Sequence, residues 1–194
     1  METYLVTPQV VFKKNNKEYI DLCLAKSLQV DYRSGAGNWI TEQNLQKDTD
    51  LQPLCQWISE EGQALTSGLN IPGKFTLVSM WITKSAGGEH LAPHSHPLSF
   101  ISGSYYFTAS PEPVFLLGEN LWQEYPLANG ADVVSPLQVD AGDLVFIPSR
   151  MRHCVPGVNK HRCVLSFNAV FTEIDTCSGK NTRILKVPAQ KMPV

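Results

Sequence analysis

The chain carries little net charge, and no part of it holds a long run of charges of one sign. Its 16 lysine and arginine residues stand against 18 aspartate and glutamate residues, which gives a formal net charge of −2 at pH 7. Binding to nucleic acid or to an anionic membrane surface depends on clustered positive charge. The composition therefore favours neither of these as a partner.

Long apolar runs and paired cysteine motifs are also missing. A membrane-spanning helix needs about 20 mostly apolar residues, and no stretch of the chain approaches that. The N-terminal METYLVTPQVVF lacks the basic and apolar regions of a signal peptide. The five cysteines, an odd number without a CxxC spacing, fit reduced packing thiols better than a disulfide framework. These features predict a cytoplasmic protein.

The length of 194 residues and the 43% hydrophobic content suit one domain, residues 1–194, with a sizeable core. Residues 1–70 hold the helical patterns. Residues 16–33 show a short helical spacing, and residues 48–69 predict a longer helix that Asp48 or Asp50 would cap and Gly68 would end. The segment VTPQVVFKK predicts a first strand, entered through Pro8.

From residue 71 to 194 short β-rich runs alternate with glycine, proline, asparagine and aspartate. They end with ILKVPA near the C-terminus. Strands this short and this regularly spaced favour an antiparallel sandwich or barrel, and a jelly roll buries their apolar faces while protecting most edges. We expect a mostly β fold, a jelly-roll core with the N-terminal helices packed on it.

Three of the five histidines, His90, His94 and His96, crowd into one short stretch. In an extended segment the side chains of His94 and His96 point the same way, so both could reach one ion. A redox metal needs a further protein ligand and open positions. His153, which follows the strand-like DLVFIPS, is the expected third ligand.

The other two histidines are weaker candidates. The spacing of His90 fits a strand face less well, and His161 lies in the polar turn VNKHR, where a solvated loop residue is expected. An HxH pair alone is as readily a hydrogen-bonding pair as a metal site, so the metal hypothesis depends on the residues around it.

An arginine opens the apolar segment RCVLSFNAV. Alternation puts four side chains on one face of this strand: Arg162, Val164, Ser166 and Asn168. A buried guanidinium needs an anionic partner, and a bound dicarboxylate would supply one through a two-pronged contact. The alternative is a surface arginine, or one paired with Glu173 or Asp175.

Residues 78–171 resemble a family of 2-oxoglutarate- and Fe(II)-dependent oxygenases found in marine bacteria and phages, within the double-stranded β-helix superfamily. The resemblance depends on several motifs taken together: MWIT at 80–83, HSHP at 94–97, ISGSYYF at 101–107, AGDLVFIPSRMRHCVPG at 141–157 and HRCVLSFNAVF at 161–171. GNWIT at 37–41 and the helix around Trp57 resemble it more weakly.

The resemblance implies that His94, His96 and His153 bind Fe(II) and that Arg162 holds the distal carboxylate of 2-oxoglutarate. Strand parity with the histidines puts Tyr106 at the cosubstrate, while Tyr105 would point away. Ser166 and Asn168 share the face of Arg162 and are expected to line the same cosubstrate site.

Two positions depart from the pattern. Most oxygenases of the wider superfamily have HxD, whereas His96 is a neutral ligand that leaves more positive charge on the ion. A serine usually follows the arginine by two residues, and Val164 stands there instead. Ser166 or a tyrosine is expected to supply the missing hydroxyl.

The function that these features predict is a 2-oxoglutarate- and Fe(II)-dependent oxygenase that hydroxylates a small molecule or a protein side chain. One alternative is a three-histidine cupin-type dioxygenase without cosubstrate, or a zinc site. A second is a jelly-roll binding module without enzymatic activity. The position of Arg162, inside the barrel or on the surface, separates the first function from the others. We keep a homodimer open as the assembly.

Overall fold

The computed structural model describes residues 12–35, 38–85, 90–109, 113–117, 134–155 and 162–173. In chain order they form β1 (Phe12–Asn15), α1 (Ile20–Gln29), β2 (Arg33–Gly35), β3 (Asn38–Ile40), the 3-10 helix η1 (Leu45–Lys47), α2 (Gln52–Gly68), β4 (Lys74–Ser85), β5 (Leu91–His94), β6 (Ile101–Tyr106), β7 (Val114–Leu117), β8 (Val134–Leu137), β9 (Asp143–Pro148), β10 (Arg152–Val155) and β11 (Arg162–Thr172).

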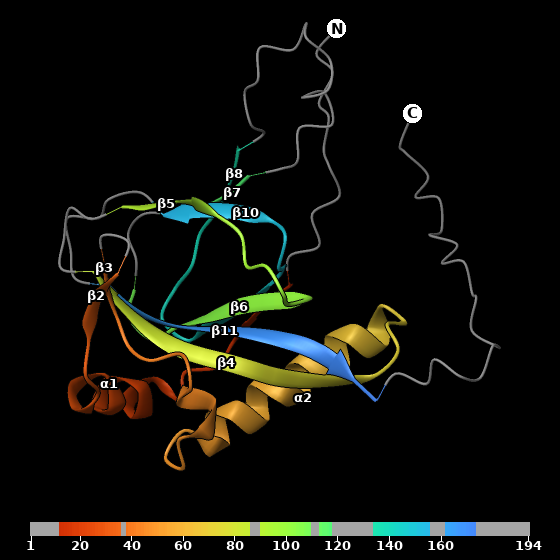
Figure 1. The fold of residues 1–194 in the computed structure, drawn as a ribbon, viewed down its shortest axis with the longest axis horizontal. Helices are drawn as coiled ribbons and strands as arrows, with labels where there is room; N and C mark the ends of the chain where they lie inside the picture. Colours follow the sequence, from red (N-terminus) through yellow and green to blue (C-terminus); the bar gives the residue numbers. More distant parts are fainter. Residues whose placement is uncertain are drawn as a thin grey trace, which may run out of the picture.

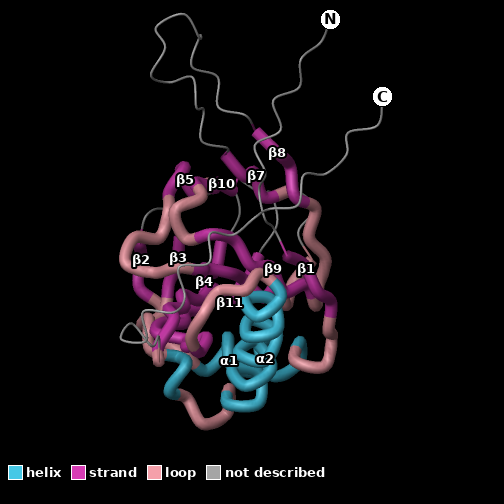
Figure 2. The backbone as a smooth tube through the Cα atoms, turned by 90° about the vertical axis from the view of Figure 1, so that its right-hand side faces the viewer, coloured by secondary structure: helices cyan, strands magenta, loops and turns pink. Residues whose placement is uncertain are grey.

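The strands form two antiparallel sheets. The larger has the order β1-β9-β6-β11-β4-β3-β2 and the smaller the order β5-β10-β7-β8. Figure 1 shows the small sheet on one side of β6, β11 and β4, and α1 and α2 on the other side. The view from the side in Figure 2 shows the same three layers. This arrangement confirms the expected mostly β fold with N-terminal helices packed on it.

Residues 1–70 contribute more than helices. They supply β1 at one edge of the large sheet and β2 and β3 at the other edge. The two portions of the chain thus share one sheet, although the assignment of the whole chain to one domain stays a prediction. No helix in the described part of the chain is long and apolar enough to cross a membrane.

Strand β11 lies at the centre of the large sheet and pairs with β4 on one side and β6 on the other. Its side chains alternate, as expected. Leu165 and Phe167 are fully buried in the core beneath the helices, whereas Val164 belongs to a second cluster between the two sheets. One strand therefore separates two apolar interiors.

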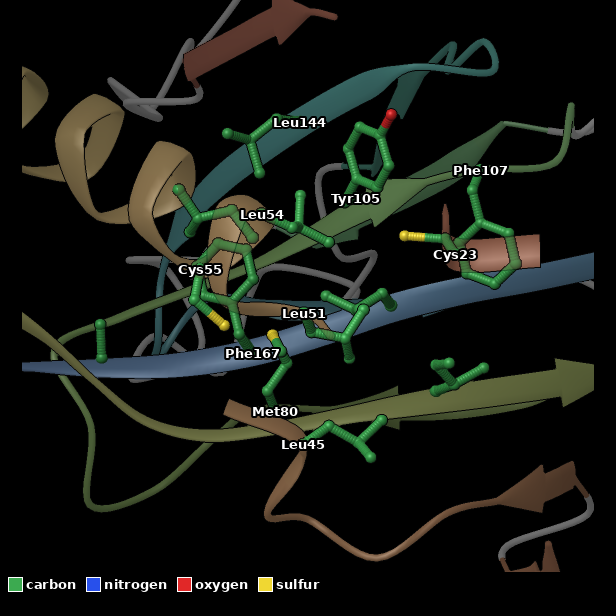
Figure 3. Close-up of a cluster of buried hydrophobic side chains, with 14 of the residues drawn as sticks. Cys23, Leu45, Leu51, Leu54, Cys55, Met80, Tyr105, Phe107, Leu144 and Phe167 are labelled. Carbon is green, nitrogen blue, oxygen red and sulfur yellow. The ribbon is translucent and has the colours of Figure 1, made fainter. Parts of the chain in front are cut away.

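The main core fills the space between the large sheet and the helices. Figure 3 shows Leu51, Leu54 and Cys55 converging with Met80 and Phe167. Leu51, Leu54 and Met80 are completely buried, as are Leu144 and Tyr105. Apolar residues of α2 recur at helical spacing, and burying that face stabilises the helix far more than intrinsic propensity does.

The ends of the helices differ from expectation. α2 begins at Gln52 after Leu51, with no side-chain cap, so the predicted capping by Asp48 or Asp50 was wrong. Both carboxylates instead pair with Lys26 of α1, which fixes the two helical segments together. The helix does end at Gly68, and the left-handed backbone follows at Asn70 with φ 54°.

Burial fits the prediction of packing thiols for the cysteines beneath the helices. Cys23 and Cys55 are free and buried, and burial raises their pKa values to about 12 and about 11. Such thiols stay protonated and unreactive. Cys177, the ILKVPA segment and most of the predicted first strand lie outside the described residues.

Gly62 and Gly68 of the same helix provide a test of packing. A Cβ at Gly62 would come within 2.6 Å of the Phe75 ring, whereas one at Gly68 would meet nothing within 4 Å. Both substitutions by alanine gain helix propensity, but overpacking costs about 1–3 kcal/mol. We expect Gly62→Ala to be less stable than Gly68→Ala by about that amount. Urea denaturation measures the difference, and equal stability would contradict the close helix–sheet contact.

Candidate metal and cosubstrate site

The three candidate histidines converge between the sheets. His94 ends β5 and lies directly opposite His153 of β10 in the sheet register. His96 follows two residues later, and its Nε2 is 3.4 Å from Nε2 of His153. One nitrogen from each of the three rings lies within 4.8 Å of the others. The structure thus brings together residues from two neighbouring strands and the segment after the first.

The position of His96 has a different structural cause from the one that the sequence argument assumed. β5 ends at His94, so a shared strand face does not place the second histidine. The backbone of His96 is anchored instead, because its N–H donates to the Ser149 carbonyl at 2.8 Å. The Ser99 hydroxyl in turn donates to the His96 carbonyl at 3.1 Å. Ser149, the residue directly after β9, therefore helps to position His96.

In two of the histidines, Nδ1 of the ring forms a hydrogen bond with a backbone carbonyl. Nδ1 of His94 lies 2.9 Å from the Ala92 carbonyl, and Nδ1 of His153 lies 3.2 Å from the Met151 carbonyl. A carbonyl only accepts, so each Nδ1 carries a proton, and Nε2 is the nitrogen left to bind a metal ion. This pattern of a fixed Nδ1–H and an exposed Nε2 is common in metal-binding histidines.

Burial keeps two of the imidazoles neutral. It lowers the pKa of both His96 and His153 to about 4, and repulsion from His94 acts in the same direction. The Trp81 ring stacks on His96 with ring centroids 5.7 Å apart, which contributes to that burial. At pH 7 both rings are therefore unprotonated, the form that binds a metal ion.

The donor set fits a divalent transition metal. Two imidazole nitrogens bound to one ion at about 2.1 Å and roughly at right angles lie about 3 Å apart, close to the 3.4 Å between His96 and His153. Three neutral nitrogen ligands suit iron, zinc or nickel. Because the described part of the chain supplies three ligand atoms, other coordination positions remain for small ligands.

A cavity of about 70 Å³ adjoins the histidines and lies between the two sheets. Apolar side chains from both sheets line it, among them Val114, Leu116, Val145 and Ile147. Hydroxyl groups and one cation interrupt that lining: Thr83, Ser102, Ser104, Tyr106, Arg162 and Ser166. In the part of the chain that the structure describes, no carboxylate lines this cavity.

Arg162 is buried in this cavity, with 5% of its surface exposed. It is the first residue of β11 and lies on the same side of the strand as Val164 and Ser166. The alternative of a surface arginine is therefore wrong. Glu173 lies near Lys74 instead, with 3.6 Å between the charged atoms. Asp175 is outside the described residues.

Tyr106 lines the cavity, and Tyr105 points to the helices, where its hydroxyl donates to the Asn16 carbonyl at 2.7 Å. Tyr106 and Tyr105 thus face the expected sides. The argument that predicted this, strand parity with the histidines, was wrong because β5 and β6 belong to different sheets. Burial raises the pKa of Tyr106 to about 12, although the charge of Arg162 acts to lower it. The phenol therefore stays a hydrogen-bond donor.

The two remaining candidates differ in position. Ser166 lines the cavity, where its hydroxyl is 3.1 Å from that of Ser104. Asn168 lies outside the cavity lining, and its amide is bound to Ser102 and Ser79. The sequence analysis also missed Thr83, whose place is opposite Val164 in the β4–β11 register. Only the pairing of these strands reveals that Thr83 lies in the lining of the cavity.

Of the two remaining histidines, the structure describes His90. His90 is exposed and is not among the three convergent residues, in agreement with its weaker spacing. His161 falls outside the described part of the chain, so its expected place in a solvated loop is not tested.

Comparisons with solved structures support the fold. A prolyl-4-hydroxylase from Pseudomonas putida is 13% identical, with a TM-score of 0.62 over 85% of this chain and 94% of its own. HygX from Streptomyces hygroscopicus, solved with nickel and 2-oxoglutarate bound, is 10% identical, with a TM-score of 0.62 over 84% and 83%. A Trichoplax adhaerens prolyl hydroxylase is 14% identical, with a TM-score of 0.59 over 83% of each chain. These are double-stranded β-helix proteins, as expected.

Sequence comparison points to one family. A search of curated proteins finds no sequence relative of the chain. A family model described as "Putative 2OG-Fe(II) oxygenase" matches residues 79–168. The matched segment contains His94, His96, His153 and Arg162. This segment is therefore similar to the 2OG-Fe(II) oxygenase family, whose members use Fe(II) and 2-oxoglutarate.

Proposed function

We propose that His94, His96 and His153 hold the Fe(II) of this oxygenase, and that Arg162 binds the distal carboxylate of 2-oxoglutarate in the adjoining cavity. The enzyme then hydroxylates a C–H bond of a small molecule or a protein side chain. The observation that carries the proposal is the burial of Arg162 in the same cavity that the three histidines line.

The oxidation chemistry comes from the bound metal ion and not from the protein side chains. When present, Fe(II) supplies the oxygen chemistry in which O₂, 2-oxoglutarate and R–H become R–OH, succinate and CO₂. The protein contributes position and electrostatics. Nδ1 of His94 and of His153 is engaged by a backbone carbonyl, which leaves Nε2 to bind the ion. The apolar walls from both sheets exclude water from the reacting groups.

Charge supports a dicarboxylate as the cavity ligand. Burial keeps His96 and His153 neutral at pH 7. Among the described residues, no carboxylate lines the cavity to offset the charge of a divalent ion there. Arg162 adds a second positive centre in the same cavity. A dianion with one carboxylate at each end matches these two centres, and charge-assisted hydrogen bonds favour it over neutral ligands.

Hydroxyl groups near Arg162 complete the carboxylate site. In the strand register Val164, which stands where a serine is usual, lies between Thr83 of β4 and Tyr106 of β6. Both neighbours line the cavity and carry hydroxyl groups. We assign them the hydrogen bonds that the missing serine would donate, and Ser166 a place along the cosubstrate.

Two alternative functions, a non-enzymatic binding module and a cosubstrate-free dioxygenase, can be compared with this proposal. The match to a family of enzymes favours an enzyme over the non-enzymatic module. A cosubstrate-free cupin-type dioxygenase has no use for a guanidinium buried beside its metal, so the position of Arg162 favours the 2-oxoglutarate-dependent reaction. A cytoplasmic location, the homodimer and the exclusion of nucleic acid and membrane partners stay predictions.

Removal of one ligand tests the metal site. We expect His153→Ala to lose stoichiometric binding of Ni(II), a redox-inert substitute for Fe(II), while the metal-free protein keeps its stability to within about 1 kcal/mol. Calorimetric titration and urea denaturation measure the two effects. His90→Ala, which changes an exposed histidine outside the group, serves as the control and should bind as the parent does. Unchanged binding by His153→Ala would refute the assignment.

Removal of the cation tests the cosubstrate site. Truncating one side of a buried charged pair costs about 2–5 kcal/mol, so Arg162→Leu should weaken 2-oxoglutarate binding by roughly 30-fold to 4,000-fold. Ni(II) affinity should not change, because Arg162 is not a ligand. Anaerobic titration of the metal-loaded protein gives the affinity, and the exposed Arg150→Leu is the matched control. Equal affinity of parent and Arg162→Leu would favour the cosubstrate-free dioxygenase.

The lowered histidine pKa values predict a pH dependence of stability. Folded His96 and His153 have pKa values of about 4, below the ordinary 6.5, so the unfolded chain binds more protons between these values. The metal-free protein should therefore lose stability as the pH falls from about 6.5 towards 4, with EDTA present throughout. His153→Ala should flatten this dependence, and His90→Ala should not. Equal slopes would show that His153 is solvated in the metal-free protein.

A further inference from the structure

A tryptophan lies against the middle histidine of the group. The indole of Trp81 stacks on the imidazole of His96, with ring centroids 5.7 Å apart and an interplanar angle of 27°. His96 follows β5, and its backbone N–H donates to the Ser149 carbonyl, which fixes the main chain at this point. The indole acts on a different part of the residue, because it covers one face of the ring.

Trp81 itself is held in place by the large sheet. It lies in β4 between Met80 and Ile82, which are both completely buried in the core beneath the helices. Its partner in the register is Ser166 of β11, and Trp81 and Ser166 both line the cavity. The indole is only 7% exposed. A large planar side chain with two rotatable bonds, packed in this way, gives the imidazole a rigid support.

The stacked indole limits how the imidazole can turn. Nε2 of His96 is 3.4 Å from Nε2 of His153, and the planes of these two rings differ by 1°. Rotation of the His96 ring about the bond to its Cβ would turn Nε2 away from His153 and bring an edge of the ring towards the indole. Packing that locks the rotamer of a ligand keeps a site in its binding geometry. Trp81 therefore opposes the motion that would take Nε2 out of the group.

Metal binding would strengthen the same contact. An imidazole that binds a divalent ion through Nε2 loses electron density to the ion, so its ring becomes more positive. The face of an aromatic ring carries negative charge density and attracts cationic groups, and tryptophan is the strongest of the aromatic side chains in this respect. The attraction increases where water is excluded, as it is around the buried indole of Trp81. The contact thus favours the metal-bound form of His96 over the metal-free form.

We propose that Trp81 is a positioning residue, whose indole holds the ring of His96 in the orientation that binds the metal and stabilises the ring once the ion is bound. The inference rests on the proposed role of His96 as a metal ligand. It also divides the work of the MWIT segment at 80–83, in which Trp81 and Thr83 line the cavity. Thr83 serves the carboxylate site, and Trp81 serves the metal site.

The test compares Ni(II) affinity in variants of the full chain by calorimetric titration at pH 7.5. Trp81→Leu removes the aromatic face beside His96. We expect it to weaken Ni(II) binding about 3-fold to 30-fold, the range for loss of a cation–π contact. Trp81→Phe keeps a smaller flat ring at the same place, so it should bind Ni(II) more tightly than Trp81→Leu and less tightly than the parent. Urea denaturation in EDTA gives the stability of each variant separately.

Trp57→Leu is the matched control. Trp57 lies on α2 and packs edge-on against Tyr105 with ring centroids 5.8 Å apart, in the core beneath the helices. Its replacement should lower urea stability and leave Ni(II) affinity unchanged. Loss of stability in Trp81→Leu with an unchanged Ni(II) affinity would show a purely structural role and overturn the inference, as would equal affinities of Trp81→Leu and Trp81→Phe. Should Trp81→Leu not fold, the weaker binding expected of Trp81→Phe relative to the parent decides in its place. If the parent protein binds no Ni(II), the proposed metal site fails first.

Discussion

The two-sided pairing of β11 is the constraint on which the site depends. Because β4 and β6 hold this strand at the centre of the large sheet, its odd-numbered residues are committed to the core beneath the helices. The even-numbered residues Arg162, Val164 and Ser166 must then face the small sheet. A shift of the register by one residue would put the guanidinium into the apolar core, at a cost that no local contact could offset. The stability of the core therefore fixes the position of the polar site.

The sequence predicts the features that depend on local periodicity. Alternation places Arg162 correctly, and the HxH spacing with a distal histidine identifies three residues that converge in space. Helical spacing finds α1 and α2, because each buries one apolar face. These predictions succeed because each depends on a single element and on the side of it that meets the core.

Features that depend on pairing between distant elements are not predictable in this way. No local pattern shows that Thr83 lies beside Val164, or that Asn168 lies beside Ser79, since both follow from the register of β4 and β11. The predicted capping of α2 failed for a related reason. Lys26, more than twenty residues earlier, pairs with Asp48 and Asp50, the carboxylates that the local pattern assigns to the start of the helix. The prediction for Tyr106 was correct by coincidence, because it counted strand parity from histidines that belong to the other sheet.

The long chain interval between the HxH pair and the third histidine has a thermodynamic consequence. His96 and His153 are 57 residues apart, so an unfolded chain that gathered all its ligands around one ion would have to close a loop of that size. Closing it costs roughly 4 kcal/mol, a factor of several hundred in affinity. In the folded protein, the pairing of β5 with β10 has already closed this loop. An ion at the site would therefore select the folded chain over the unfolded one, and the supply of iron in the cell would help to set how much of the chain is folded.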